Sequence, residues 1–207
     1  MNRYLALILA VTAALGAGCK SNAKKPILYL YPEEVTDVTV RFAEPDSVEL
    51  TSTWPEYGAD GWSVTAYPDG TLVDAATDEE FYALYWEGLA SPPGRLDTGA
   101  VVAGEDTAEF LDDALEQLGL TPRERNEFVI YWAPILELNR HNFVHFSTDE
   151  WDAQVPLDID PAPDSLVRVM MYWRPCAGNM KVEPQELVMP AREGFTVVEW
   201  GGTRLRR

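Results

Sequence analysis

Cysteine and histidine are scarce in this sequence of 207 residues, which has two of each. Cys19 lies in an N-terminal leader-like stretch, so we expect Cys176 to have no partner and the fold to depend on its core. Cys176 lies in Arg-Pro-Cys-Ala-Gly-Asn, a sequence typical of a loop, without a neighbouring histidine to activate a thiol. The sequence therefore does not indicate a disulfide scaffold or a cysteine nucleophile.

Basic residues are also few, with 16 Lys and Arg against 34 Asp and Glu, and the net charge is −18. A chain this acidic repels polyanions, which argues against nucleic acid and anionic lipid head groups as partners. Cationic ligands remain compatible with it. Hydrophobic residues make up 46% of the chain, enough for a globular core, and there are no internal repeats.

Long apolar runs are absent too. The longest, Tyr4 to Leu15, has about twelve residues, too few to cross a hydrocarbon layer of roughly 30 Å as a helix. It follows a short basic start, Asn2-Arg3, and precedes the small residues Gly16 to Gly18, which is typical of a signal peptide.

Leu15-Gly16-Ala17-Gly18-Cys19 resembles the lipobox of bacterial lipoproteins, although Gly16 replaces the usual branched residue. The resemblance implies a signal peptide at residues 1–18, a lipid that includes palmitate on Cys19, and a lipid-anchored tether at residues 19–25. It places the protein in the bacterial cell envelope, and Lys20, where Asp would retain it at the inner membrane, favours the outer membrane. A plain secretory signal and an uncleaved anchor remain as alternatives.

Short alternating runs predict strands in the first half of the chain. Two of them flank Pro68-Asp69-Gly70, a strong hairpin signal. Residues 81–87 read as a strand or a short helix. The expected strands are 27–31, 35–42, 48–54, 61–67 and 71–74. We predict a β-sandwich-like domain at residues 26–92, ending at the Ser91-Pro92-Pro93-Gly94 break.

The second half, residues 93–207, is predicted to be an α+β domain. Asp106 with Glu109, and Thr121 with Glu124, form two capping-box patterns at the starts of helices. The second helix is either short or continues through residues 128–132. We prefer a change to strand there, because these residues are aromatic and β-branched and Pro134 follows them. Further strands are expected at 142–146, 166–173 and 195–200. The whole is a β-rich α+β fold.

Three motifs carry weak chemical signals. Asp97-Thr98-Gly99 looks like the active turn of aspartic proteases, but no apolar strand precedes it. His141 and His145 have the spacing of a helical zinc motif, but their surroundings favour a strand, where they would lie about 13 Å apart. Asp158, Asp160 and Asp164 lack the glycine and distal glutamate of a calcium loop. We therefore predict no metal and no cofactor.

Acidic residues beside aromatic ones are the candidates for catalysis, because burial beside tryptophan raises a carboxyl pKa. Glu87, Glu137 and Glu199 are such residues, and two of them close together would suit glycoside hydrolysis. The alternatives are solvent-facing carboxylates on half-buried strands, or buried ion pairs with Arg168, Arg174 or Arg192. Arg168 and Arg192 are the candidate binding residues.

Lys25-Pro26-Ile27-Leu28-Tyr29-Leu30-Tyr31-Pro32 and the run from Gly194 to Gly202 resemble a widespread group of bacterial exported proteins without an assigned activity. The resemblance implies a common fold only. We therefore predict a lipid-anchored protein of the cell envelope that acts as a binding or structural module. Its ligand would be an envelope glycan or a protein. The alternative is an envelope glycan hydrolase, and whether the protein is an enzyme is left open.

Overall fold

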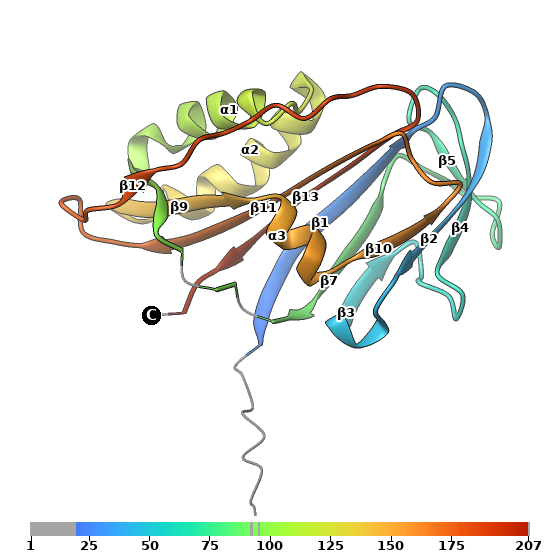
Figure 1. The fold of residues 1–207 in the computed structure, drawn as a ribbon, viewed down its shortest axis with the longest axis horizontal. Helices are drawn as coiled ribbons and strands as arrows, with labels where there is room; N and C mark the ends of the chain where they lie inside the picture. Colours follow the sequence, from blue (N-terminus) through green and yellow to red (C-terminus); the bar gives the residue numbers. More distant parts are fainter. Residues whose placement is uncertain (1–19, 92, 95, 207) are drawn as a thin grey trace, which may run out of the picture.

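The computed structural model describes residues 20–91, 93–94 and 96–206, and in this part of the chain two β-sheets and three α-helices form one layered body (Figure 1). The predicted signal peptide and the predicted lipidation site, Cys19, lie outside the described residues. No helix in the described part is long and apolar enough to cross a membrane. The predicted β-rich α+β class is confirmed.

The larger sheet has eight strands, and the first strand of the chain lies well inside it (Figure 1). β1 pairs antiparallel with the last strand, β13, on one side and with β7 on the other. Two pairs of adjacent strands run parallel: β11 with β13, and β12 with β8. In spatial order the strands are β12 (Glu183–Pro184), β8 (Thr98–Ala103), β9 (His141–Ser147), β11 (Ser165–Pro175), β13 (Thr196–Arg204), β1 (Ser21–Tyr31), β7 (Leu84–Ala90) and β3 (Val48–Trp54).

The smaller sheet packs against one face of the larger one across an apolar core that includes Leu28, Trp62 and Trp86. It contains the predicted hairpin, whose turn has Gly70 at φ 88° and an Asp69 side chain that accepts from the Thr71 N–H. Its strands, in spatial order, are β10 (Leu157–Asp160), β2 (Thr36–Phe42), β4 (Trp62–Ala66), β5 (Leu72–Asp74) and β6 (Glu80–Phe81).

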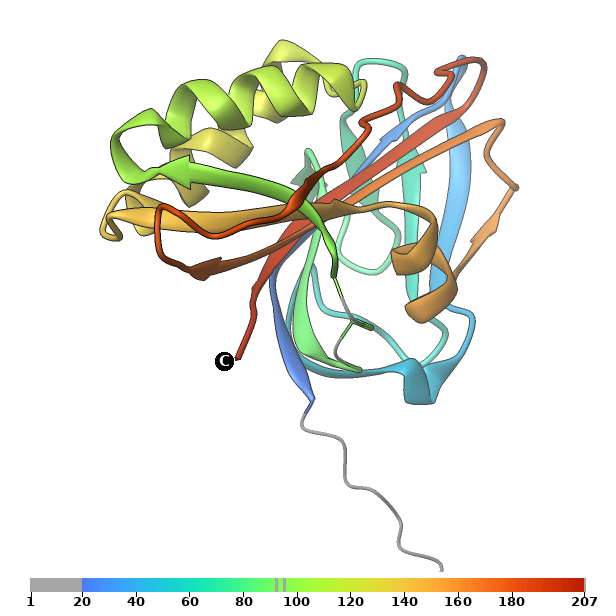
Figure 2. The same ribbon diagram turned by 60° about the vertical axis from the view of Figure 1, so that its left-hand side comes forward.

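Two helices, α1 (Thr107–Gln117) and α2 (Pro122–Leu136), cover the other face of the larger sheet, and a short helix, α3 (Asp149–Gln154), lies beside β11 (Figures 1 and 2). The capping box predicted at Thr121 and Glu124 is present, whereas Asp106 precedes α1 without a side-chain cap. Short single-turn helices occupy residues 45–47 and 104–106.

The strand predicted at residues 128–132 is wrong, because this stretch belongs to α2. Phe128, Trp132 and Leu136 recur every four residues and all are buried, so the helical spacing places them together against the sheet. Packing of this face outweighs the strand preference of aromatic and β-branched residues. Pro134 stands in the last turn of α2.

The predicted boundary near residue 92 does not separate the sheets. β1, β3 and β7 from the first segment pair within the larger sheet beside strands of the second, and β10 from the second segment pairs with β2 in the smaller sheet. Most residues of the predicted tether belong to the folded part. Ser21 to Lys25 lie in β1, where the backbones of β7 and β13 stabilise this polar stretch by pairing with it.

Candidate functional site

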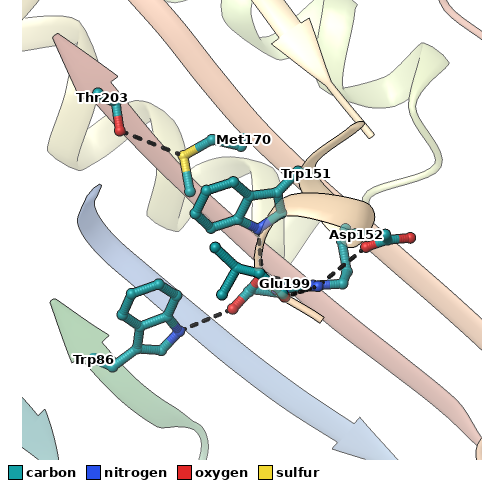
Figure 3. Close-up of polar contacts among 8 residues, drawn as sticks. Trp86, Trp151, Asp152, Met170, Glu199 and Thr203 are labelled. Atoms are coloured by element: carbon teal, nitrogen blue, oxygen red, sulfur yellow. Dashed lines mark hydrogen bonds and ion pairs between the residues drawn. The ribbon is translucent and has the colours of Figure 1, made fainter. Parts of the chain in front are cut away.

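Glu199, one of the three candidate carboxylates, is buried inside the molecule. On β13, Val198 and Trp200 face the helices, and Glu199 faces the smaller sheet and α3 with 1% of its surface exposed. The indole N–H groups of Trp86 and Trp151 each donate to it at 2.9 Å, to different carboxylate oxygens (Figure 3). Their rings lie almost parallel, with centroids 6.2 Å apart.

Arg168 completes this cluster from the neighbouring strand. It stands opposite Glu199 in the β11–β13 register, and its Nε donates to Glu199 Oε2 at 2.8 Å. Nη2 lies 2.6 Å from the same oxygen, and Nη1 donates to the Val155 carbonyl at 2.7 Å. Nη1 also reaches Asp152 at 3.2 Å. Burial raises the pKa of the Asp152 carboxyl, while Arg168 opposes that rise.

The Glu199 cluster is a structural ion pair rather than an open reactive site. Both carboxylate oxygens are occupied by indole or guanidinium donors, and the Arg168 side chain is 1% exposed. A buried pair of this kind needs such extra hydrogen bonds, because desolvation otherwise costs several kcal/mol per ion. The ion pair that the sequence left as an alternative to catalysis, between Glu199 and Arg168, is therefore present.

The other two candidate carboxylates lie elsewhere. Glu87 alternates with Trp86 on β7, so it faces the helix side of the sheet, where Lys24 forms an ion pair with it and the Lys25 N–H donates at 3.3 Å. Glu137 is exposed at the C-terminal cap of α2. Glu87 and Glu199 thus occupy opposite faces of one sheet, which does not provide the two facing carboxylates that glycoside hydrolysis requires.

Arg192 binds a second buried carboxylate. Its guanidinium donates to both oxygens of Glu124, at 2.9 and 3.2 Å, and Nη1 also donates to the Gly119 carbonyl at 3.1 Å. The Glu124 side chain is fully buried and also accepts from the Thr121 N–H at 2.7 Å. Tyr31 lies beneath Arg192, and burial next to Glu124 raises its pKa. Arg192 therefore fastens the segment before β13 to the start of α2.

The weaker motifs occupy structural positions. Asp97 comes directly before β8, not after a strand as in the protease turn, and its carbonyl accepts from Glu183. His141 and His145 both lie on β9, as predicted from their surroundings. His145 is buried, Thr98 contacts its Nδ1 at 2.9 Å, and burial lowers its pKa.

The three aspartates of the supposed calcium loop also occupy structural positions. Asp158 pairs with Arg41 at 2.7 Å, Asp160 stands opposite Thr39 where β10 pairs with β2, and Asp164 accepts from the Phe195 N–H at 2.8 Å. Among the described residues, no group of three or more His, Cys, Asp or Glu side chains could hold a metal ion.

An aromatic cleft is the feature that sequence reasoning missed. It has a volume of about 490 Å³ and lies where Trp54 ends β3, next to Tyr85 on β7 and, one strand further, Ile27 on β1. Trp54 is 62% exposed and meets Phe81 edge to face at 5.8 Å. The lining residues are Ile27, Trp54, Glu79, Glu80, Phe81, Tyr82, Ala83 and Tyr85.

Some of the aromatic side chains in this cleft are exposed to solvent rather than buried. Trp54 and Tyr82 are among the exposed large hydrophobic side chains, and the carboxylates of Glu79 and Glu80 are exposed at its edge. The signal in the sequence was an aromatic residue at the end of one strand together with the run Phe81-Tyr82-Ala83-Leu84-Tyr85. Only the β3–β7 register reveals that these stretches meet.

A comparison of the chain with known protein families, with curated proteins and with solved structures found no match.

Proposed function

We propose that this chain is a lipid-anchored binding module of the bacterial cell envelope, and that its aromatic cleft binds a neutral glycan. The observation that carries the proposal is the exposed Trp54 ring beside Tyr82 and Tyr85 in a concave site. Clefts of a few hundred Å³ that combine aromatic faces with a few polar groups are the usual form of small-ligand sites.

The chemistry of the cleft favours sugar. Aromatic rings offer flat apolar faces to the C–H groups of a sugar ring, and Glu79 and Glu80 can accept hydrogen bonds from its hydroxyls. The net charge of −18 disfavours anionic polymers, so a neutral glycan fits better than a phosphate-rich one. The separation of Glu87 from Glu199 supports binding in preference to hydrolysis.

Trp54→Ala tests the cleft. We expect the variant to bind a soluble N-acetylglucosamine oligosaccharide at least about tenfold more weakly in calorimetry, because truncating an aromatic anchor typically costs 2 kcal/mol or more. Tyr67→Ala is the control, since Tyr67 is an exposed aromatic outside the cleft lining. Equal affinities of the two variants, or wild-type protein that binds no such sugar, would rule out this ligand class.

Cys19→Ala tests the anchor. We expect a fatty acid given to growing cells to label the wild-type chain and not the variant, and the variant to leave the membrane fraction. A chain with several acyl groups stays bound, whereas one without them has little to hold it. Cys176→Ala is the matched control, because the structure places Cys176 as a free thiol in the folded part. Labelling that survives in Cys19→Ala would contradict the proposed address.

A further inference from the structure

Arginines that form no ion pair within the described chain gather at one end of the larger sheet. All other described arginines pair with carboxylates. Arg140 directly precedes β9, Arg174 lies near the end of β11, and Arg204 and Arg206 lie at and just after the end of β13. Because β9 and β1 run antiparallel to β11 and β13, these positions share one end of the sheet with the start of β1 (Figures 1 and 2).

A hollow of about 360 Å³ places two of these arginines next to the start of β1. Arg174 and Arg206 line it together with Ser21, which follows Cys19 closely in the chain. Arg204 lies at the same end of the sheet but on the helix face, with its guanidinium over the Trp173 ring at 5.4 Å. The other lining residues carry no charge: Pro93, Gly94, Leu96, Phe143 and Leu205.

The Arg174 guanidinium has hydrogen-bond donors to spare. It carries five N–H donors, and within the described chain it contacts the Phe143 ring at 5.5 Å and the Met180 Sδ at 3.7 Å. A thioether is a weak acceptor and supplies no counter-charge. A half-buried arginine in this condition is unexpected in a chain of net charge −18. The planar group is suited to a phosphate, which it can bind through two parallel hydrogen bonds.

Carboxylates flank this end of the sheet but do not line the hollow. Glu49, at the start of β3, already pairs with Lys20 at 3.0 Å. Glu105 and Glu137 line a separate hollow together with Arg140, so Arg140 has acidic neighbours. The arginine patch is therefore defined as Arg174, Arg204 and Arg206. The net charge of the whole chain, which argued against anionic lipid head groups as partners, does not describe this surface.

We propose that the arginine patch docks the folded part onto the phosphates of anionic phospholipids, in the same membrane that holds the acyl chains on Cys19. The inference rests on the proposed lipid anchor. Each arginine near an anionic surface favours the docked state about fivefold, so the patch orients an anchored chain but does not replace the anchor. Docking at this end would place the aromatic cleft, which lies further along β1 at Ile27, roughly 15–20 Å from the head groups.

Energy transfer to the membrane tests the docking. The full chain, purified from membranes, carries a donor dye on Cys176, the free thiol that follows the end of β11. It is reconstituted into vesicles of phosphatidylcholine alone or with phosphatidylglycerol, both with acceptor dye on the head groups. We expect more transfer in the anionic vesicles, and a smaller difference at high salt, because salt screens the attraction. Equal transfer in the two membranes would overturn the proposal.

Charge-matched variants assign the effect to the patch. Arg174→Gln with Arg206→Gln should lower the ratio of docked to undocked chains on anionic vesicles at least about tenfold, whereas the two Lys variants together should keep most of the effect. Arg123→Gln with Arg125→Gln is the control, because both lie at the start of α2, near Tyr31 at the opposite end of β1. Equal losses in the patch and control pairs, or a similar loss with lysine, would overturn the proposal.

Flotation of the wild-type chain with neutral vesicles reports the acyl anchor alone. Its absence would count against lipidation of Cys19, and the patch would then be judged by flotation with anionic vesicles. There the patch variant should float less than the control variant, and equal flotation would overturn the docking. Trp54→Ala should leave energy transfer unchanged, since the cleft and the hollow have no lining residue in common.

Discussion

Replacing Arg168 with methionine is expected to destabilise the protein by about 3–5 kcal/mol, since breaking a buried ion pair from one side leaves an unpaired charge. Glu199 would keep the two indole donors but lose its counter-charge in a site that is 1% exposed. The loss is a large part of a total stability of about 5–15 kcal/mol. Urea unfolding followed by tryptophan fluorescence should show a lower midpoint with an unchanged slope.

Arg41→Met is the control for this prediction. Arg41 pairs with Asp158 at a similar distance, 2.7 Å, but both side chains are about half exposed. A surface pair contributes only about 0–1 kcal/mol, so this variant should unfold close to the wild-type midpoint. Adding Glu199→Gln to Arg168→Met removes both charges and should recover part of the loss. A cost for Arg168→Met no greater than that for Arg41→Met would show that the cluster does not hold the core together.

Arg192→Met is expected to cost about 2–3 kcal/mol, somewhat less than the loss of Arg168, because Arg192 itself is partly exposed. Its partner Glu124 is fully buried, yet it keeps the hydrogen bond from the Thr121 N–H. The variant should also loosen the chain segment that immediately precedes Arg192. Hydrogen exchange should therefore increase at Gln185 to Pro190 and at the start of α2.

Arg123→Met is the comparison for Arg192. Arg123 lies next to Glu124 in the first turn of α2. It pairs with Glu127 at 3.5 Å, and its side chain is 60% exposed. We expect its loss to leave both the unfolding midpoint and the exchange of the 185–190 segment close to wild type. Faster exchange in Arg123→Met as well would mean that the helix as a whole, rather than the Arg192 clamp, secures this segment.

Local patterns were sufficient for the hairpin at Pro68-Asp69-Gly70 and for the capping box at Thr121, because a few neighbouring residues determine these structures. They were insufficient for residues 128–132, where packing of Phe128 and Trp132 against the sheet outweighs strand preference. The Pro-Gly break near residue 92 predicted a domain boundary and gave no sign that β10, which follows it, pairs with β2, which precedes it. Such pairings depend on contacts between distant segments, which local sequence does not specify.

The sequence singled out Glu199 as a candidate catalytic residue and left a buried ion pair with an arginine as an alternative. The structure shows that alternative, between Glu199 and Arg168. Sequence patterns gave no means to place Trp86 and Trp151 next to that carboxylate, because Trp86 comes from β7 and Trp151 from α3. The aromatic cleft depends in the same way on the pairing of Trp54 with Tyr85.

The position of β1 between β13 and β7 determines when the chain can fold. Ala23 pairs with Thr203, near the opposite end of the sequence, so the sheet cannot close until the last strand is available. Closing so long a loop is entropically unfavourable and slows folding. A chain that is threaded through a membrane from its N-terminus would therefore remain unfolded until translocation is complete. β1, the strand that follows the proposed lipidation site, would be among the last to be fixed in place.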